Sequence, residues 1–181
     1  ESVGQLLVDL VGIRGVRGEE AIILRALRLL LLVAVKRDVQ TVLGEQGAVQ
    51  RCVDVLKRRR RERYGREQEM MEISCKLLRL LCEKDEANKA RLWSCRGISV
   101  LIDRLRDGDV LTHEKTLEAL TACLASEEKI LKNGQDAVRE ANGIAIAIRL
   151  LRLGNSKMKA LVLCLINMTC KDHERNQEAC V

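Results

Sequence analysis

The amino-acid sequence repeats itself along its length. Three segments share a short polar-to-apolar stretch, a glycine and an apolar run with helical spacing. They are residues 38–56, 88–105 and 136–153. The glycines that align the pattern, 43, 50 and 46 residues apart, are Gly4, Gly47, Gly97 and Gly143. This period is typical of units built from two or three helices. A chain of such units buries its core between neighbouring repeats and leaves a long surface for partners, so binding is its expected function.

The composition favours helices throughout. Proline is absent, and the aromatic residues are Trp93 and Tyr64 alone. The hydrophobic content of 47% is ample for a core, which must be built from Leu, Ile, Val, Ala, Cys and Met because the chain has no Phe. Apolar residues recur at helical spacing, and the absence of proline removes the strongest helix breaker. We therefore predict an all-α fold.

The apolar periodicity also predicts the individual helices. They are expected at about 3–13, 19–36, 38–45, 48–60, 67–83, 86–93, 98–106, 136–141, 143–153 and 157–170. A further helix should begin with Thr112 as its N-cap and extend to about Ala125, and the charged segment 126–135 should form a long turn. The expected repeats are 1–37, 38–86, 87–134 and 135–173. Residues 174–181 match the opening helix of another repeat, so we expect a piece of a longer stack.

The cysteines and the apolar runs indicate where such a chain would reside. Most of the eight cysteines fall on apolar helical positions, and no signal-like segment opens the sequence, so we predict reduced core cysteines in a cytoplasmic protein. They are Cys52, Cys75, Cys82, Cys95, Cys123, Cys164, Cys170 and Cys180. The longest apolar run, 29–35, is far shorter than the ~20 residues of a membrane-spanning helix.

The clearest repeat, 143–176, resembles armadillo repeats. It has the glycine, an apolar second helix, a small turn and an Ala-Leu-rich third helix. The third helix ends in Asn167-Met168-Thr169, where the family has Asn-Leu-Ala. The resemblance covers nearly the whole chain and implies a right-handed α-solenoid of about four repeats, with the third helices lining a concave groove. The HEAT family is the near alternative, but a glycine between two helices favours armadillo.

One feature of importin-like armadillo proteins is missing. In those members an aromatic residue and an asparagine recur on each third helix and hold an extended peptide. The matching pairs here are Ala26 and Leu30, Lys76 and Leu80, Ala119 and Cys123, and Leu163 and Asn167. One asparagine in four positions and no aromatic residue disfavour a nuclear-import carrier.

The basic character of the chain is concentrated in residues 57–66. Their seven basic residues and one acid account for the whole formal net charge of +6. The 50-residue spacing between Gly47 and Gly97 exceeds an armadillo unit of about 42 residues, so the run reads as an insertion between a second and a third helix. Arginine forks suit carboxylate and phosphate, which predicts an anion-binding loop; a solvated loop without a partner, or a nuclear localisation signal, is the alternative. The predicted anion-binding residues are Lys57, Arg58, Arg59, Arg60, Arg61, Arg63 and Arg66.

Together these features predict a protein-interaction scaffold that binds a partner segment in a helical groove. The resemblance assigns the groove to the third helices, whose lysines favour an acidic, helical segment; an acidic polymer surface is another candidate. The predicted partner-binding residues are Lys76, Lys115, Lys159, Leu163 and Asn167. Two alternatives stay open: a structural subunit of a cytoskeletal or other multiprotein assembly, and a regulatory domain of a multidomain signalling protein.

The sequence gives little indication of a metal site, an active site or a nucleic-acid site. No CxxC occurs, and His113 and His173 lie 60 residues apart, so we expect no metal site. No phosphate-binding glycine loop, nucleophile elbow or His-carboxylate pattern appears. We therefore predict that the chain has no enzyme activity and no cofactor. Nucleic acid is disfavoured as the main ligand, because the neutral remainder of the chain lacks an aromatic platform for bases.

Overall fold

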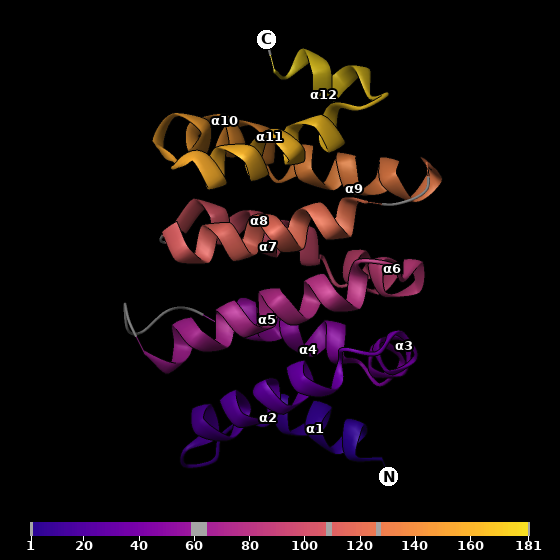
Figure 1. Ribbon diagram of the computed structural model, residues 1–181, viewed down its shortest axis with the longest axis vertical. Coiled ribbons are helices and arrows are strands. Elements are labelled where there is room, and N and C mark those ends of the chain that lie inside the picture. Colours follow the sequence, from indigo (N-terminus) through magenta and orange to yellow (C-terminus); the bar gives the residue numbers. More distant parts are fainter. Residues whose placement is uncertain (1, 59–64, 108–109, 126–127, 181) are drawn as a thin grey trace. The chain divides into compact units, whose positions relative to one another are not determined.

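The computed structural model describes residues 2–58, 65–107, 110–125 and 128–180, and every regular element within these ranges is an α-helix (Figure 1). The all-α prediction is therefore confirmed for the described chain. By contacts the chain divides into two compact units, Glu1–Cys95 (unit 1) and Arg96–Val181 (unit 2). The predicted repeat 38–86 falls within unit 1, and the predicted repeat 135–173 falls within unit 2.

Unit 1 holds one complete three-helix repeat between parts of two others. Its helices are α1 (Val3–Val11), α2 (Glu19–Val33), α3 (Arg37–Glu45), α4 (Ala48–Leu56), α5 (Arg66–Cys82) and α6 (Glu86–Ser94). The long helices α2 and α5 pack along one another, and α1 packs on α2 and α4 (Figure 1). The short helix α3 contacts α4, α5 and α6. In repeat terms α1 and α2 are a second and a third helix, α3 to α5 form a full repeat, and α6 opens the next.

Unit 2 has the same order of helices. They are α7 (Gly97–Asp107), α8 (Val110–Leu124), α9 (Glu128–Glu140), α10 (Gly143–Leu153), α11 (Ser156–Cys170) and α12 (Glu174–Glu178). Here the third helices α8 and α11 pack along one another, as α2 and α5 do in unit 1 (Figure 1). The short α12 packs on α9 and α11. Residues 174–178 thus form a helix where the sequence pattern predicted the first helix of a further repeat.

The core of each unit is aliphatic. Leu27, Met70 and Leu77 are among the fully buried side chains of unit 1, and Leu120 and Leu165 lie buried in unit 2. All eight cysteines are free, and four of them are core residues as predicted, namely Cys52, Cys75, Cys82 and Cys123. The prediction of core positions is wrong for the other four, because Cys95 and Cys170 are half-buried and Cys164 and Cys180 are exposed. Burial raises the pKa of the Cys52 thiol far above its ordinary range, so this sulfur is an inert apolar group.

A buried asparagine ties the last helix of each unit, α6 in unit 1 and α12 in unit 2, to the repeat before it. In unit 1 the carboxamide nitrogen of Asn88 on α6 donates to the backbone carbonyls of Gln40 on α3 and Leu81 on α5, at 3.1 and 2.9 Å. Carbonyls in the last turn of a helix have no partner within the helix, and Asn88 supplies one for Leu81. The α3 backbone comes so close to Asn88 that a Cβ atom at Gly44 would overlap the carboxamide oxygen. Gly44 therefore makes room for this junction.

The same junction recurs in unit 2. The carboxamide nitrogen of Asn176 on α12 donates to the carbonyls of Gln135 on α9 and Thr169 on α11, at 3.2 and 2.9 Å. Both asparagines are wholly buried. Each stands seven residues after the third-helix carbonyl that it satisfies. The two units thus use one hydrogen-bond pattern to join consecutive repeats.

The turn between first and second helices requires one residue in the left-handed conformation. That residue is Gly47 (φ +92°) in unit 1, and Arg96 (φ +59°) and Asn142 (φ +60°) at the equivalent turns. The alignment of Gly47 with Gly97 and Gly143 is therefore wrong by one position, because Gly97 and Gly143 begin helices α7 and α10. Glycine is retained at 143 for space, since a Cβ there would lie 2.7 Å from Cγ1 of Val138.

We expect Arg96→Gly to raise the free energy of unfolding by about 1 kcal/mol, because an L-residue in the left-handed region costs about 1–2 kcal/mol that glycine avoids. The Arg96 side chain is exposed and forms no hydrogen bond or ion pair with other described residues, so its removal should cost little. Chemical denaturation followed by circular dichroism measures the change. The matched control is Ala90→Gly at an exposed position inside α6, where glycine should lower stability by about 1 kcal/mol. Equal effects of both changes would contradict the interpretation.

Two sequence predictions about helix bounds are wrong. Thr112 is not an N-cap but lies inside α8, which begins at Val110, and its carbonyl accepts a hydrogen bond from the Thr116 hydroxyl at 2.8 Å. The segment 126–135 is not a long turn, because α9 already begins at Glu128. Its charged residues include Glu and Lys, which are strong helix formers, so charge alone did not indicate a turn.

Three helices are shorter than the periodicity suggested. The first ends at Val11, and the helix that starts at Glu19 ends at Val33 because Lys36 must be extended to open α3. The helix 48–56 stops at Leu56, its last apolar residue before the basic run. Apolar spacing marks the buried face of a helix, and the terminal turns are set by caps instead.

Candidate partner-binding site

Neighbouring third helices are joined by ion pairs on their exposed faces. In unit 1 the Arg28 guanidinium on α2 contacts the Glu69 carboxylate on α5, with Nε donating to Oε1 at 3.0 Å. In unit 2 the Lys157 ammonium on α11 lies 2.6 Å from Oε2 of Glu114 on α8. Hydrogen bonds from Lys157 and Asn155 lower the pKa of the Glu114 carboxyl. Exposed pairs of this kind contribute at most about 1 kcal/mol each, so they fix the relative position of two helices more than they stabilise the fold.

The three predicted lysines do not share one repeated position. Lys76 lies six residues before the last residue of α5, Lys115 nine before that of α8, and Lys159 eleven before that of α11. Lys159 is exposed, and the other two are half-buried. The positions of the lysines differ because the turns between second and third helices vary in length. An alignment of the glycines before the second helices therefore does not align the residues of the third helices.

The charge of Lys115 is already partly matched within the chain. Its ammonium donates to both carboxylate oxygens of Glu118, at 2.9 Å each, one turn along α8. Lys76 and Lys159 form no ion pair with other residues that the structure describes. A partner carboxylate would therefore meet an uncommitted cation at Lys159, but would have to compete with Glu118 at Lys115.

The other two predicted residues, Leu163 and Asn167, are brought together on α11. They stand one helical turn apart, both are exposed, and both line a pocket of about 510 Å³ at the α11–α12 corner of unit 2. Leu163 is 57% exposed. The side-chain amide of Asn167 forms no hydrogen bond with the described residues, so its donor and acceptor are both available to a ligand.

The remaining walls of this α11–α12 pocket were not predicted. They are contributed by the end of α11 and by α12, with no acidic side chain among them: Ile166, Cys170, Lys171, Gln177 and Cys180. Gln177 is held in place by a hydrogen bond from its amide nitrogen to the carbonyl of Cys170 at 2.9 Å. A signal for these walls is present in the sequence, because residues 174–181 match an opening helix that must pack against the end of α11.

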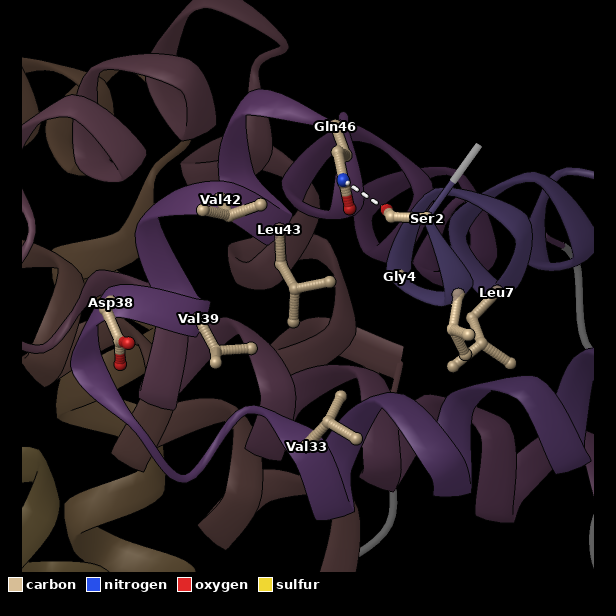
Figure 2. A pocket seen from close by; sticks show the side chains of 10 residues that line it. Ser2, Gly4, Leu7, Val33, Asp38, Val39, Val42, Leu43 and Gln46 are labelled. Carbon is tan, nitrogen blue, oxygen red and sulfur yellow. Dashed lines mark hydrogen bonds between the residues drawn. The ribbon is translucent and has the colours of Figure 1, made fainter.

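A second pocket, of about 280 Å³, lies in unit 1 between α1, α2 and α3 (Figure 2). Leu7, Val33, Val39, Val42 and Leu43 give it an apolar lining. Figure 2 also shows the polar rim, where the Gln46 amide nitrogen donates to the Ser2 hydroxyl at 2.9 Å. None of these residues was predicted as a site.

The predicted anion-binding loop lies largely outside the described residues. Of its seven members the structure describes Lys57, Arg58 and Arg66, while Arg59, Arg60, Arg61 and Arg63 are not among the described residues. The Arg58 guanidinium pairs with the Glu19 carboxylate at 3.3 Å. Burial is the main cause that lowers the pKa of Arg58, with Arg14 adding to it, and Glu19 offsets both. Arg58 therefore acts as a structural link between α2 and the end of α4.

The other residues that match the aromatic–asparagine pairs of importin-like members are buried or half-buried. Ala26, Leu30, Ala119 and Cys123 lie in the core and cannot touch a partner. When helices are aligned by their last residues, Asn167 corresponds to Arg79 in α5 and Thr121 in α8. The sequence-based alignment with Leu80 and Cys123 is therefore displaced by one and two residues. An asparagine ladder is absent in either register within the described third helices.

Among solved structures, two engineered proteins are similar to this chain. One has a TM-score of 0.82 and 15% identity, covering 99% of this chain and 67% of its own. The other has a TM-score of 0.81 and 16% identity, covering 98% of this chain but only 40% of its own, so the chain spans less than half of that protein. A designed armadillo repeat protein in complex with the peptide (KR)4 has a TM-score of 0.81 and 14% identity, covering 99% and 70%. No family model and no curated protein matches the sequence.

These likenesses establish the class of the fold. The chain has an all-α, armadillo-like repeat fold, as its resemblance to armadillo repeats implied. At this level of identity they speak for the fold alone. Within the described ranges no group of three or more His, Cys, Asp or Glu side chains is arranged to hold a metal ion. In the same part of the chain no helix has the length and apolarity needed to cross a membrane.

Proposed function

We propose that this protein is an interaction scaffold that binds a segment of a partner protein at the α11–α12 pocket of unit 2. The observation that carries the proposal is the exposure of Leu163 beside the uncommitted amide of Asn167. An apolar side chain of the partner can cover Leu163, while the Asn167 amide pairs with a backbone N–H and C=O. Armadillo-like structure supports this use, because a designed armadillo repeat protein of similar fold is in complex with a peptide.

The charge of the site favours an acidic segment. The α11–α12 pocket contains Lys171 and no acid, and Lys159 lies on the same helix without a partner among the described residues. We therefore expect a charge preference opposite to that of the designed neighbour, which is in complex with a basic peptide. The basic run 57–66 would add long-range attraction that accelerates encounter and weakens with salt.

Peptide titrations followed by fluorescence anisotropy test this proposal. A labelled peptide of alternating Glu and Leu should bind at least about tenfold more tightly than (KR)4, a difference of about 1.4 kcal/mol. Leu163→Ser and Asn167→Ala should each weaken the acidic peptide, and Lys159→Glu should weaken it roughly two- to fivefold. Lys115→Glu should have less effect, because Glu118 already neutralises Lys115. Lys76→Glu reports whether α5 of unit 1 takes part.

Matched controls separate the site from the general surface. Leu153→Ser removes an exposed leucine on α10, and Asn133→Ala removes an exposed asparagine on α9, both outside the α11–α12 pocket. These changes should leave binding unaltered. If the two peptides bind equally, or if the controls weaken binding as much as Leu163→Ser does, the proposed site is wrong. Replacing Arg59, Arg60, Arg61 and Arg63 by serine should lower the association rate and its salt dependence.

A second candidate function is that of a structural subunit in a larger assembly. One observation favours it: unit 1 exposes Val3, Leu32 and Val35 by more than 70% each, close in sequence to residues that line its apolar pocket. Such surface is costly for a monomer and typical of an interface. Sedimentation of the purified chain discriminates the two functions, because a permanent subunit should self-associate or aggregate at micromolar concentration, whereas an adaptor should remain monomeric.

A further inference from the structure

Two free thiols face one another at the α11–α12 corner. The sulfur of Cys170, the last residue of α11, lies 3.3 Å from the sulfur of Cys180, which follows α12. A disulfide requires an S–S separation of about 2.05 Å, so the two sulfurs need to approach by roughly 1 Å. Both residues line the same pocket as Leu163 and Asn167.

This arrangement is held by the α12 junction rather than by chance proximity along the chain. Asn176 anchors α12 to α9 and α11 through its two buried hydrogen bonds. Gln177 adds a bond to the carbonyl of Cys170, and the Cys170 thiol itself points at the carbonyl of Asn176 at 3.5 Å. These contacts turn the chain back after Cys170, so that Cys180 returns to it ten residues later. The pair is therefore preorganised.

The two thiols differ in accessibility. Cys180 is exposed, whereas Cys170 is half-buried. Burial, followed by the interaction with Cys180, raises the pKa of Cys170 to about 11. The exposed sulfur should therefore react first with an oxidant, and the half-buried one should act as the resolving thiol, which is the usual division of labour in a reversible thiol pair.

From this geometry we infer that Cys170 and Cys180 form a reversible intrachain disulfide when the chain meets a low-molecular-weight disulfide such as oxidised glutathione. The Cys180 thiolate attacks one sulfur of glutathione disulfide, which forms a mixed disulfide and expels one glutathione thiolate. The Cys170 sulfur, losing its proton to solvent, then attacks the Cys180 sulfur and expels the second glutathione thiolate. In sum, two protein thiols are oxidised to one disulfide, and one glutathione disulfide is reduced to two thiols.

The bond would fix one wall of the α11–α12 pocket. The helix α12 has only five residues, so the reduced form relies on a few hydrogen bonds to hold it. A disulfide across this short loop removes conformational freedom from the detached state and so disfavours detachment of α12. The effect of the disulfide on ligand binding rests on the proposed function, because the pocket is the same. The formation of the disulfide does not depend on that function.

Tryptic mapping tests the bond without any partner. The reduced chain is incubated with oxidised glutathione, free thiols are alkylated, and the protein is digested. Trypsin cuts after Lys159, Lys171 and Arg175, so Cys170 lies in peptide 160–171 and Cys180 in peptide 176–181. We expect these two peptides to be linked, the number of alkylated thiols to fall by two, and a dithiol reductant to reverse both changes.

Two variants make the assignment specific. Peptide 160–171 also contains Cys164, an exposed cysteine, so Cys164→Ser must leave the link intact. Cys170→Ser must abolish it and leave Cys180 as a stable glutathione adduct; circular dichroism checks that this variant is folded. A link through Cys164, a link between two chains, or full alkylation of Cys170 after oxidation would overturn the inference. If the link forms but peptide titration detects no binding to either form, the disulfide stands and the proposed function fails.

Discussion

Gly44→Ala is expected to lower the free energy of unfolding by roughly 3 kcal/mol, through overpacking of about 1–3 kcal/mol and a displaced hydrogen-bonding group of similar cost. The added Cβ would overlap the carboxamide oxygen of Asn88. The carboxamide nitrogen of the same side chain donates to two carbonyls, so the side chain cannot move without losing these bonds. Inside a helix alanine normally stabilises by about 0.5–1 kcal/mol relative to glycine, so the expected sign is opposite to that of helix propensity. Urea denaturation followed by circular dichroism measures the effect.

A double-mutant cycle identifies the clash as the cause. In the background of Asn88→Ala the space beside Gly44 is empty, so adding Gly44→Ala should cost little and could recover the helix propensity of alanine. We expect the two single changes to be strongly non-additive. Additive losses would mean that Gly44 is required for some reason other than the Asn88 carboxamide.

The class of the fold was predictable because every repeat of the sequence shows the same pattern of apolar spacing. The glycine spacings of 43, 50 and 46 residues and the repeated apolar faces led to an all-α repeat architecture. Composition also indicated an aliphatic core, since a chain without Phe has few other choices. These signals are redundant over many residues, so the loss of one, such as the misassigned Thr112, did not alter the architecture.

The register of the repeats was less predictable for a physical reason. The left-handed turn position accepts glycine, but also Asn142 and, at some energetic cost, Arg96. A glycine such as Gly143 can equally be retained because its neighbours leave no space for a Cβ. Glycine can therefore be required for a positive φ at the turn or for lack of space at the next position. An alignment on glycines treats these two neighbouring positions as one.

The candidate site was predicted in part. Leu163 and Asn167 were selected by resemblance, and the structure brings them into one pocket. The lysines were selected by their charge and by their expected place on the groove side of the third helices, and neither criterion reveals that Lys115 is engaged by Glu118. The buried asparagines were missed, although Glu86-Ala87-Asn88 and Glu174-Arg175-Asn176 repeat a Glu-x-Asn pattern at the start of a first helix. The signal that could have found them is this asparagine, which recurs at the same position near the start of a short first helix.

Asn88→Ala is expected to lower the free energy of unfolding by about 3 kcal/mol, because it removes the donor to a buried carbonyl at the end of α5 and opens a cavity. The carbonyl of Leu81 loses its only side-chain donor among the described contacts, and the guanidinium of Arg91 loses its acceptor, Oδ1 of Asn88, at 2.9 Å. Asn88→Asp preserves the volume but replaces the donating NH2 by an oxygen that repels both carbonyls. If the donor is what matters, Asp should therefore cost at least as much as Ala.

The second junction supplies an internal comparison. Asn176→Ala removes the same two kinds of hydrogen bond, but the helix that it anchors has only five residues and packs on α9 and α11. Its loss should release α12 and accelerate amide exchange there, with little change in the unfolding of the rest of unit 2. Asn133→Ala, at an exposed position on α9, should alter stability by less than about 0.5 kcal/mol. If Asn88→Ala costs no more than Asn133→Ala, the buried junction is not what joins consecutive repeats.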